Sequence, residues 1–164
     1  MGNPLVTILG VGNFLFTDEG FGIRVIEKLQ TEYRFPEDVH VVDGGVLGIN
    51  LLGVIAQPDH LIVVDAMCNG GKAGDLYRLA GEEIPRRVLA KNSLHQVDLL
   101  EALTLCQALD KVPETVILGV EPEDIETLSL EMSPAVRRQV APMAARVLQE
   151  LDRLGVTYSR RSCS

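Results

Sequence analysis

The sequence predicts an α/β fold with three layers, in which a twisted, mostly parallel sheet of about five strands has helices on both faces. Short and nearly continuous apolar runs are typical of strands that are buried on both faces. These runs alternate with longer stretches in which apolar residues recur at helical spacing. The order along the chain is βαβαββαβα, and this alternation predicts a parallel sheet covered by helices on its two faces.

The first half of the chain supplies the strands expected at the centre of the sheet. Strands are expected over residues 5–12, 38–45 and 60–67, and helices over residues 20–33 and 47–56. The first helix has apolar residues at helical spacing, whereas the second is too apolar to be fully exposed. The glycine-rich run NGGKAGD that follows predicts a flexible loop.

The second half adds an edge strand, a further buried strand and two helices. Residues 74–79 are expected to form a short strand, antiparallel at an edge, and residues 115–122 a buried one. The capping-box pattern Ser93-x-x-Gln96 marks the start of the helix between them.

The last helix has a clear beginning and end. Ser133 is its expected cap, and Pro134 occupies its first position. Gly155 ends the helix, and Pro142 is expected to kink it.

Composition places the chain among ordinary globular proteins. Its 164 residues are 46% hydrophobic and 23% charged, and we expect residues 1–158 to form a single α/β domain. Residues 159–164, SRRSCS, are expected to be a disordered tail. The net charge of −8 argues against nucleic acid and anionic membranes as partners, because both need a basic surface.

The sequence also predicts a cytoplasmic location. No apolar run approaches the length of a membrane span, and the N-terminus lacks the pattern of a secretion signal. Cys68, Cys106 and Cys163 are far apart and odd in number, which is typical of free thiols in a reducing compartment.

Acidic residues follow several of the predicted strands. Asn13, Asp18 and Glu19 follow the first strand, Asp43 ends the second and Asp65 ends the third. Ligands bind at the carboxyl ends of the strands in such sheets, so these side chains are expected at one edge. Several carboxylates there would repel one another unless a cation or a proton shared the site.

Among the histidines, His95 is the candidate ligand at this edge. His60 starts the third strand and belongs to the opposite edge, and His40 lies within the second strand. His95 falls at a helix N-terminus, which favours the neutral imidazole that binds metals. Glu19, Asp65 and His95 together suit a divalent transition metal with open coordination positions.

Each acid also has a structural interpretation. Asp18 is most simply the N-cap of the first helix, with a helper role at the site as the alternative. Glu19 could complement the helix dipole, and Asp43 could cap a turn. Glu121 is expected to be a solvated loop acid, whereas a carboxylate at Asp65 needs a partner.

Four segments carry a resemblance to a known family. GVGNFLFTDEGFG, VVDGG, HLIVVDA and LHQVDL closely resemble the hydrogenase maturation endopeptidases, in order from residue 5 to about residue 155. The resemblance looks closest to the branch that processes uptake-type hydrogenases. It implies a twisted, mostly parallel sheet flanked by helices. It also implies an endopeptidase that removes the C-terminal extension of a nickel–iron hydrogenase large-subunit precursor.

The resemblance implies roles for individual residues as well. The family's metal ligands correspond to Glu19, Asp65 and His95, which would contact nickel already carried by the substrate. Asp43 or Asp18 would serve as the catalytic base, and the sequence does not choose between them. One departure is Val46, which replaces the threonine of the commoner DGGT pattern.

Two other functions remain open from the sequence. A nickel carrier or assembly chaperone without catalytic activity would use the same three ligands. A nucleotide-binding oxidoreductase would use the turn Gly10-x-Gly12 with Asp43. Leu15 at the third glycine position and the acids after it argue against nucleotide binding.

Overall fold

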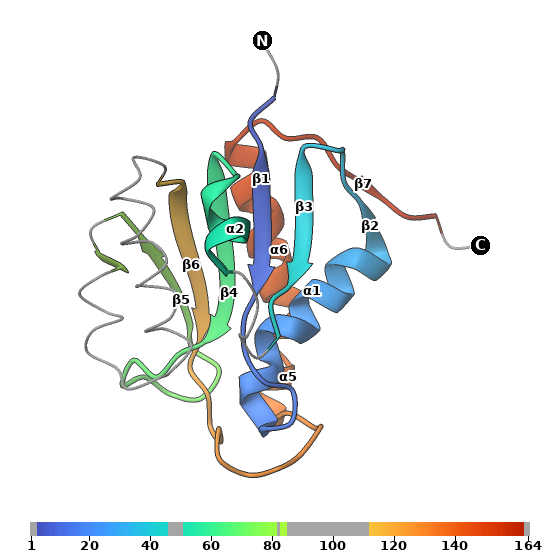
Figure 1. The fold of residues 1–164 in the computed structure, drawn as a ribbon. Helices are drawn as coiled ribbons and strands as arrows, with labels where there is room; N and C mark the ends of the chain where they lie inside the picture. The colour runs from blue at the N-terminus through green and yellow to red at the C-terminus, as the bar shows by residue number, and fades with distance from the viewer. Residues whose placement is uncertain (1–2, 46–50, 82, 85–111, 163–164) are drawn as a thin grey trace.

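The computed structural model describes residues 3–45, 51–81, 83–84 and 112–162, and Figure 1 shows their arrangement. The central sheet has five strands in the order β3-β1-β4-β6-β5. It comprises β1 (Val6–Gly10), β3 (Val39–Asp43), β4 (His60–Ala66), β5 (Leu76–Ala80) and β6 (Glu114–Val120). All neighbours pair in parallel except β5, which is antiparallel to β6 at one edge. The predicted α/β class and the antiparallel edge strand are confirmed.

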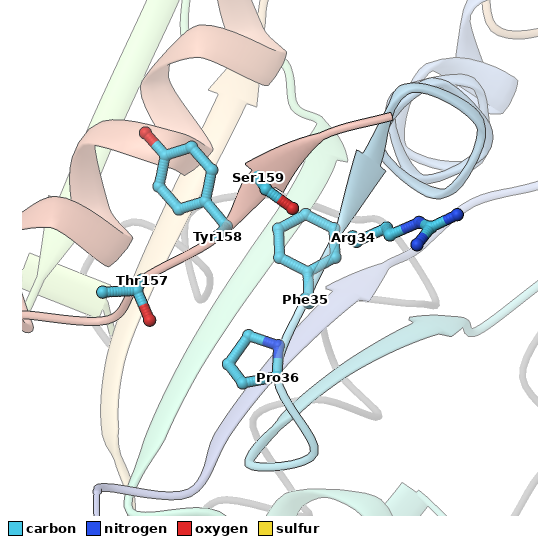
Figure 2. Close-up of a pocket in the computed structure, with 6 residues that line it drawn as sticks. All are labelled: Arg34, Phe35, Pro36, Thr157, Tyr158 and Ser159. Atoms are coloured by element: carbon cyan, nitrogen blue, oxygen red, sulfur yellow. The ribbon is translucent and has the colours of Figure 1, made fainter. Parts of the chain in front are cut away.

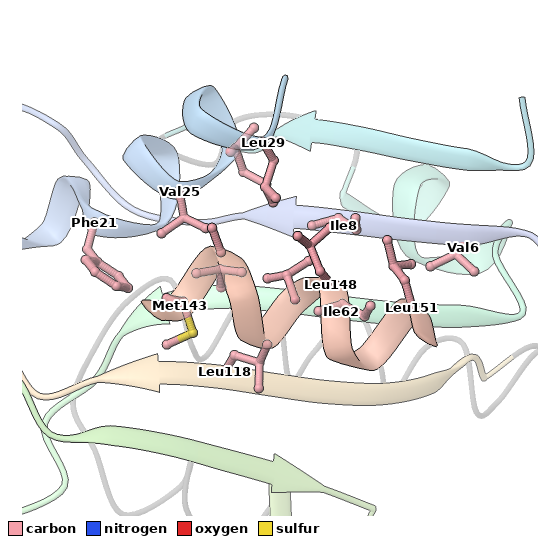
Figure 3. Packing of buried hydrophobic residues seen from close by; sticks show 14 of the residues in the cluster. Val6, Ile8, Phe21, Val25, Leu29, Ile62, Leu118, Met143, Leu148 and Leu151 are labelled. Carbon is pink, nitrogen blue, oxygen red and sulfur yellow. The ribbon is translucent and has the colours of Figure 1, made fainter. Parts of the chain in front are cut away.

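Helices cover both faces of this sheet. The helices α1 (Phe21–Glu32) and α6 (Val140–Arg153) pack on one face, where alternate residues of β1, β4 and β6 join them in one apolar cluster. Figure 3 shows α6 lying across these strands, with Met143, Leu148 and Leu151 directed at the sheet. The helix α2 (Leu51–Ala56) packs on the other face through Ile55. Because side chains alternate between the two faces along each strand, the core consists of two layers, one on each face of the sheet.

Two glycines bring α1 unusually close to the sheet. A Cβ atom at Gly22 would collide with the carbonyl oxygens of Val64 and Val11, and one at Gly10 would collide with Ile26 and with Gly22. Only glycine allows this approach, which sets the start of α1 directly over the ends of β1 and β4. This contact holds the segment before α1 at the carboxyl edge of the sheet.

The last helical region differs from the prediction of one kinked helix. It consists of α5 (Pro134–Arg137) and α6, with a break at Arg138 and Gln139. Pro142 lies in the first turn of α6, where its missing N–H costs little. Its ring would clash with the carbonyl four residues earlier, at Arg138, so the break falls at that residue and not at the proline.

The end of the chain forms a strand that the sequence did not predict. β7 (Ser159–Arg160) pairs antiparallel with β2 (Tyr33–Arg34), which directly follows α1. Arg161 donates backbone and side-chain hydrogen bonds to carbonyl oxygens of Glu32, Gln30 and Tyr33, at the end of α1. These partners order residues that composition alone assigned to a disordered tail.

Beside this ribbon, β2 and the segment before β7 enclose a shallow hollow of about 330 Å³. Phe35, Pro36 and Tyr158 lie along it in Figure 2. The rings of Tyr33, Phe35 and Tyr158 pack together here with centroids 6.0–6.4 Å apart.

Two predicted helices extend beyond the described residues. The helix expected over 47–56 is described from Leu51 onward, and the one starting at Ser93 lies wholly outside the described residues. Among the described helices, none is long and apolar enough to span a membrane.

Candidate functional site at the carboxyl edge of the sheet

The register of the sheet brings three of the predicted acidic segments to one edge. Gly10, at the end of β1, is paired with Asp43 on one side and with Val64 on the other. Asp65 therefore lies one residue beyond this level, and it is itself paired with Gly119 of β6. The prediction that Asp43 and Asp65 share the carboxyl edge is confirmed.

Glu19 is held at the same edge by a compact turn. Gly12 has a φ of +136°, and a Cβ atom there would collide with the carbonyl oxygen of Glu19. The N–H of Asn13 donates to that same oxygen at 3.1 Å, and Asn13 Oδ1 accepts from the N–H of Leu15 at 3.0 Å. Both the backbone and the side chain of Asn13 therefore bond the turned backbone. Glu19 thus projects from rigid backbone next to the end of β1.

Asp18 is not the N-cap of α1, as the simplest interpretation had it. The cap position is Gly20, and neither α1 nor the 3-10 turn Thr17–Gly20 has a side-chain cap. Asp18 is 0% exposed, and its carboxylate accepts hydrogen bonds from the backbone N–H groups of Glu123, Asp124 and Ser133, each at 2.8 Å. The hydroxyl of Ser133 donates a fourth, also at 2.8 Å.

Asp43 keeps its carboxylate at the surface. Its Oδ1 accepts a hydrogen bond from the N–H of Gly45 at 2.9 Å, so the expected turn-capping role is confirmed. Gly45 has a φ of +50°, and Gly44 donates to the carbonyl of Gly10 at 2.8 Å. The turn after β3 is therefore tied to the end of β1, with an exposed carboxylate on it.

Among the described histidines, His60 lies at the edge that strand direction predicts. His60 lies at the start of β4, at the opposite edge, with its Nδ1 atom 3.4 Å from Glu114 Oε2. His40 is exposed within β3. His95 lies outside the described residues, and within the described part of the chain no three His, Cys, Asp or Glu side chains are grouped to hold a metal. The trio of Glu19, Asp65 and His95 stays a prediction.

Glu121 is not the solvated acid that its loop sequence suggested. It is only 7% exposed, and its Oε2 accepts hydrogen bonds from the N–H of Asn69 at 2.6 Å and from the hydroxyl of Tyr77 at 2.9 Å. Burial, and then the bond and charge of Glu121, raise the pKa of Tyr77 to about 12. Backbone bonds to Asp75 and Gly74 join Glu121 to the loop after β4.

A sequence signal for this role was available. Glu121 directly follows the buried strand β6, much as Asp65 lies near the end of β4, and a buried carboxylate in such a position needs partners. The aromatic residue that meets it lies 44 positions earlier, on the antiparallel edge strand. Only the strand pairing places the two side chains together.

The segment 15–17 and the loop 121–133 lie side by side above this edge. Phe16 and Ser129 form a parallel bridge, and Thr17 donates its hydroxyl to the carbonyl of Thr127 at 2.6 Å. On the surface of this pair, Leu128 and Leu130 are 72% and 59% exposed. The two segments form one structural unit next to Glu19.

Chemically, the described edge attracts cations. Asp43 and Glu19 reach solvent there, Asp65 is nearly buried beside them, and the chain carries a net charge of −8. Leu15 stands where a dinucleotide would need a glycine. The fold and these residues define an α/β protein with acidic side chains gathered at the carboxyl edge of its sheet.

Comparison with known proteins shows the family to which this chain belongs. The family described as "Hydrogenase maturation protease" matches residues 23–150, more than half of the chain. The chain belongs to the hydrogenase maturation protease family, and the resemblance seen in its motifs is confirmed.

Similar proteins support this membership over nearly the whole length. The hydrogenase expression/formation protein HupD of Bradyrhizobium diazoefficiens is 38% identical over 159 residues, covering 96% of this chain and 83% of that protein. The hydrogenase 2 maturation protease of Escherichia coli is 37% identical over 153 residues, covering 92% and 93%. The structure of the hydrogenase maturating endopeptidase HybD from E. coli has a TM-score of 0.91 at 36% identity, covering 97% of this chain and 99% of that one.

Proposed function

We propose that this protein is the endopeptidase that removes the C-terminal extension from the large-subunit precursor of a nickel–iron hydrogenase. The match to the E. coli hydrogenase maturating endopeptidase carries this proposal, because it covers 97% of the chain with a TM-score of 0.91. Of the predicted site residues, Asp43, Asp65 and Glu19 lie at the carboxyl edge of the sheet, where ligands bind in such folds. The cytoplasm, predicted from the sequence, is the proposed place of the reaction.

The nickel in this proposal belongs to the substrate. Glu19, Asp65 and His95 would contact nickel that the precursor already holds, and zinc or cadmium could occupy the same three ligands. Two carboxylates and an imidazole are a donor set that such ions accept while keeping positions open for the ligands of the precursor. Rigid backbone around Glu19 and burial around Asp65 favour a fixed docking geometry.

Asp43 is the proposed general base. Its carboxylate is exposed at the site edge, and the turn Asp43–Gly45 holds it in place. It would take a proton from the water that attacks the scissile carbonyl, and the nickel carried by the docked substrate would supply Lewis-acid activation. The proton would then pass to the departing amine, completing hydrolysis. Asp18 was the other candidate base, but its burial and four hydrogen bonds support a different role.

Mass spectrometry of the large subunit tests the proposal. Incubation of the protein with nickel-loaded precursor is expected to lower the subunit mass by that of the C-terminal peptide. Precursor without nickel should keep its mass, because it cannot dock at the three ligands. An unchanged mass with nickel-loaded precursor would point to a carrier or chaperone instead.

A further inference from the structure

The carboxylate of Asp18 fastens both ends of a long loop. Glu123 and Asp124 lie at the start of the loop 123–133 and Ser133 at its end, and all three donate to Asp18. The backbone of Asp18 adds a bond, with its N–H donating to the carbonyl of Asp124 at 3.0 Å. One side chain thus closes the loop against the segment that precedes α1.

A second set of contacts joins the middle of the same loop to that segment. The N–H of Thr17 donates to the carbonyl of Ser129 at 3.0 Å, and the N–H of Ser129 donates to the carbonyl of Leu15 at 2.9 Å. The segment 15–19 and the loop 123–133 are therefore joined at three places. Movement of the loop would carry the segment with it.

Because the carboxylate of Asp18 is buried, it would destabilise the fold if its hydrogen-bond donors were missing. A carboxylate removed from water is destabilising unless hydrogen bonds replace its hydration. Four donors reach Asp18, and bonds to an ionised acceptor are stronger than neutral ones. A carboxylate so enclosed does not touch a substrate, and any effect on the reaction passes through its neighbours.

The nearest neighbour in the chain is Glu19. Its N–H donates to the carbonyl of Phe16 at 3.0 Å, and its carbonyl accepts from Asn13 at 3.1 Å. The first bond lies inside the segment 15–19, and the second joins the end of that segment to Asn13. The direction of the Glu19 side chain depends on this segment keeping its shape.

We propose that Asp18 is a positioning residue, which fixes the Glu19-bearing turn by binding both ends of the loop 123–133. For the reaction itself this rests on the proposed function, in which Glu19 contacts the metal-bearing substrate. The proposed effect of Asp18 on the order of the turn does not depend on any activity, because that order can be measured in the protein alone.

The test compares Asp18→Asn with a matched control, Asp124→Asn. Asparagine at position 18 turns one acceptor oxygen into a donor, which then faces another N–H or O–H group. Asp124 is a loop acid whose Oδ1 accepts from Glu126 and Thr127 at 2.9 Å each, without side-chain contact to the Glu19 segment. Amide hydrogen exchange at Asn13 and Glu19 reports the order of the turn. Steady-state processing of nickel-loaded precursor gives kcat and KM.

In Asp18→Asn we expect amide exchange at Asn13 and Glu19 to become about tenfold faster or more. We expect kcat to fall about 100-fold, with KM changed far less, because a shifted Glu19 would still dock the nickel but would hold the scissile bond out of position for attack. Asp124→Asn should leave both readouts close to the wild type. If Asp18 had a purely structural role, Asp18→Asn would lower the melting temperature without lowering kcat more than it changes KM.

Several outcomes overturn the proposal. One is a folded Asp18→Asn whose amide exchange at Asn13 and Glu19 matches the wild type. Another is an unchanged kcat in Asp18→Asn. The third is a loss of kcat in Asp124→Asn as large as that in Asp18→Asn. If Asp18→Asn does not fold, Ser133→Ala removes one donor only and should show the same pattern at smaller size, and its absence there overturns the proposal too. If the wild type itself leaves the precursor uncut, the proposed function fails, and exchange in the variant still decides whether Asp18 orders the turn.

Discussion

At the scale of single residues, two buried acids organise the site edge from opposite sides. Asp18 accepts four hydrogen bonds from the loop 123–133, and Glu121 accepts two from Asn69 and Tyr77. Both lie at the carboxyl edge, and both hold loops. Asp43 is exposed and Glu19 is partly exposed, and the proposed function assigns to them the contacts with the substrate.

The first residue-scale prediction concerns Glu19. Glu19→Gln keeps size and hydrogen-bonding capacity but removes the charge that draws a metal-bearing substrate. We expect processing of nickel-loaded precursor to fall by roughly 100-fold or more, with an unchanged thermal melt. Glu126→Gln, an exposed acid of the neighbouring loop, is the control and should process normally. Full activity in a folded Glu19→Gln would remove Glu19 from the site.

A second prediction concerns Tyr77. Tyr77→Phe deletes the hydroxyl that donates to buried Glu121, and we expect a loss of about 1.5–3 kcal/mol in the free energy of unfolding at neutral pH. Urea denaturation measures this loss. Because the folded-state pKa of Tyr77 is raised from 10.0 to about 12, its stabilisation is present below pH 10.0 and is lost as pH rises toward about 12. The gap between wild type and variant should shrink in that window, and a constant gap would contradict this account.

The sequence predicted which acids gather at the edge, but not which of them are buried. Strand direction alone brings Asp43, Asp65 and Glu19 together, and this information is local. The partners of Asp18 lie 105 to 115 residues away, and no local pattern announces them. An N-cap and a loop-fastening carboxylate look identical in the sequence, since both are an acid before a helix.

At the scale of elements, the approach of α1 to the sheet depends on glycine. The third glycine of a dinucleotide-binding turn, which lets helix and strand pack closely, is replaced here by Leu15. Gly22 supplies that packing instead, from within α1. In other α/β proteins this close contact between helix and strand supports a phosphate site. Here it holds an acidic segment next to the strand ends.

Gly22→Ala tests this packing. A Cβ atom at position 22 would meet backbone oxygens of Val11 and Val64, which have no flexible end to move. We expect a loss of about 1–3 kcal/mol or more in unfolding free energy, measured by chemical denaturation. Arg146→Ala, an exposed change on α6, should stay within about 0.5 kcal/mol of the wild type. Equal stability of the two variants would show that α1 can move away without cost.

Truncation after Tyr158 tests the unpredicted ribbon. It removes β7 and the hydrogen bonds from Arg161 to the end of α1, and it should lower the free energy of unfolding by about 1–3 kcal/mol. The ribbon lies away from the carboxyl ends of the strands in Figure 1, so processing by the folded enzyme should be unchanged. A truncated protein with wild-type stability would return these residues to the disordered tail that composition predicts.

At the scale of the whole molecule, the site is assembled from segments spread along most of the chain. The turn 12–19, the turn 43–45, the end of β4 and the loop 121–133 meet at one edge because four strands run parallel. Alternating apolar runs were enough to predict that arrangement. The break at Arg138 and the pairing of β7 were missed, because each depends on contacts between elements rather than on periodicity within one.

The Asp18 contacts have a consequence for the kinetics of folding. Bonds between residues more than 100 positions apart require most of the chain to be in place before they can form, so they belong to the late side of the folding barrier. Loss of such bonds should raise the unfolding rate while leaving the refolding rate nearly unchanged. Stopped-flow refolding and unfolding of Asp18→Asn in urea would show this as a shift of the unfolding limb alone, and a slowed refolding limb would place the contact in the nucleus instead. A side chain that holds the active edge in place would then also determine how long the native state of the protein persists.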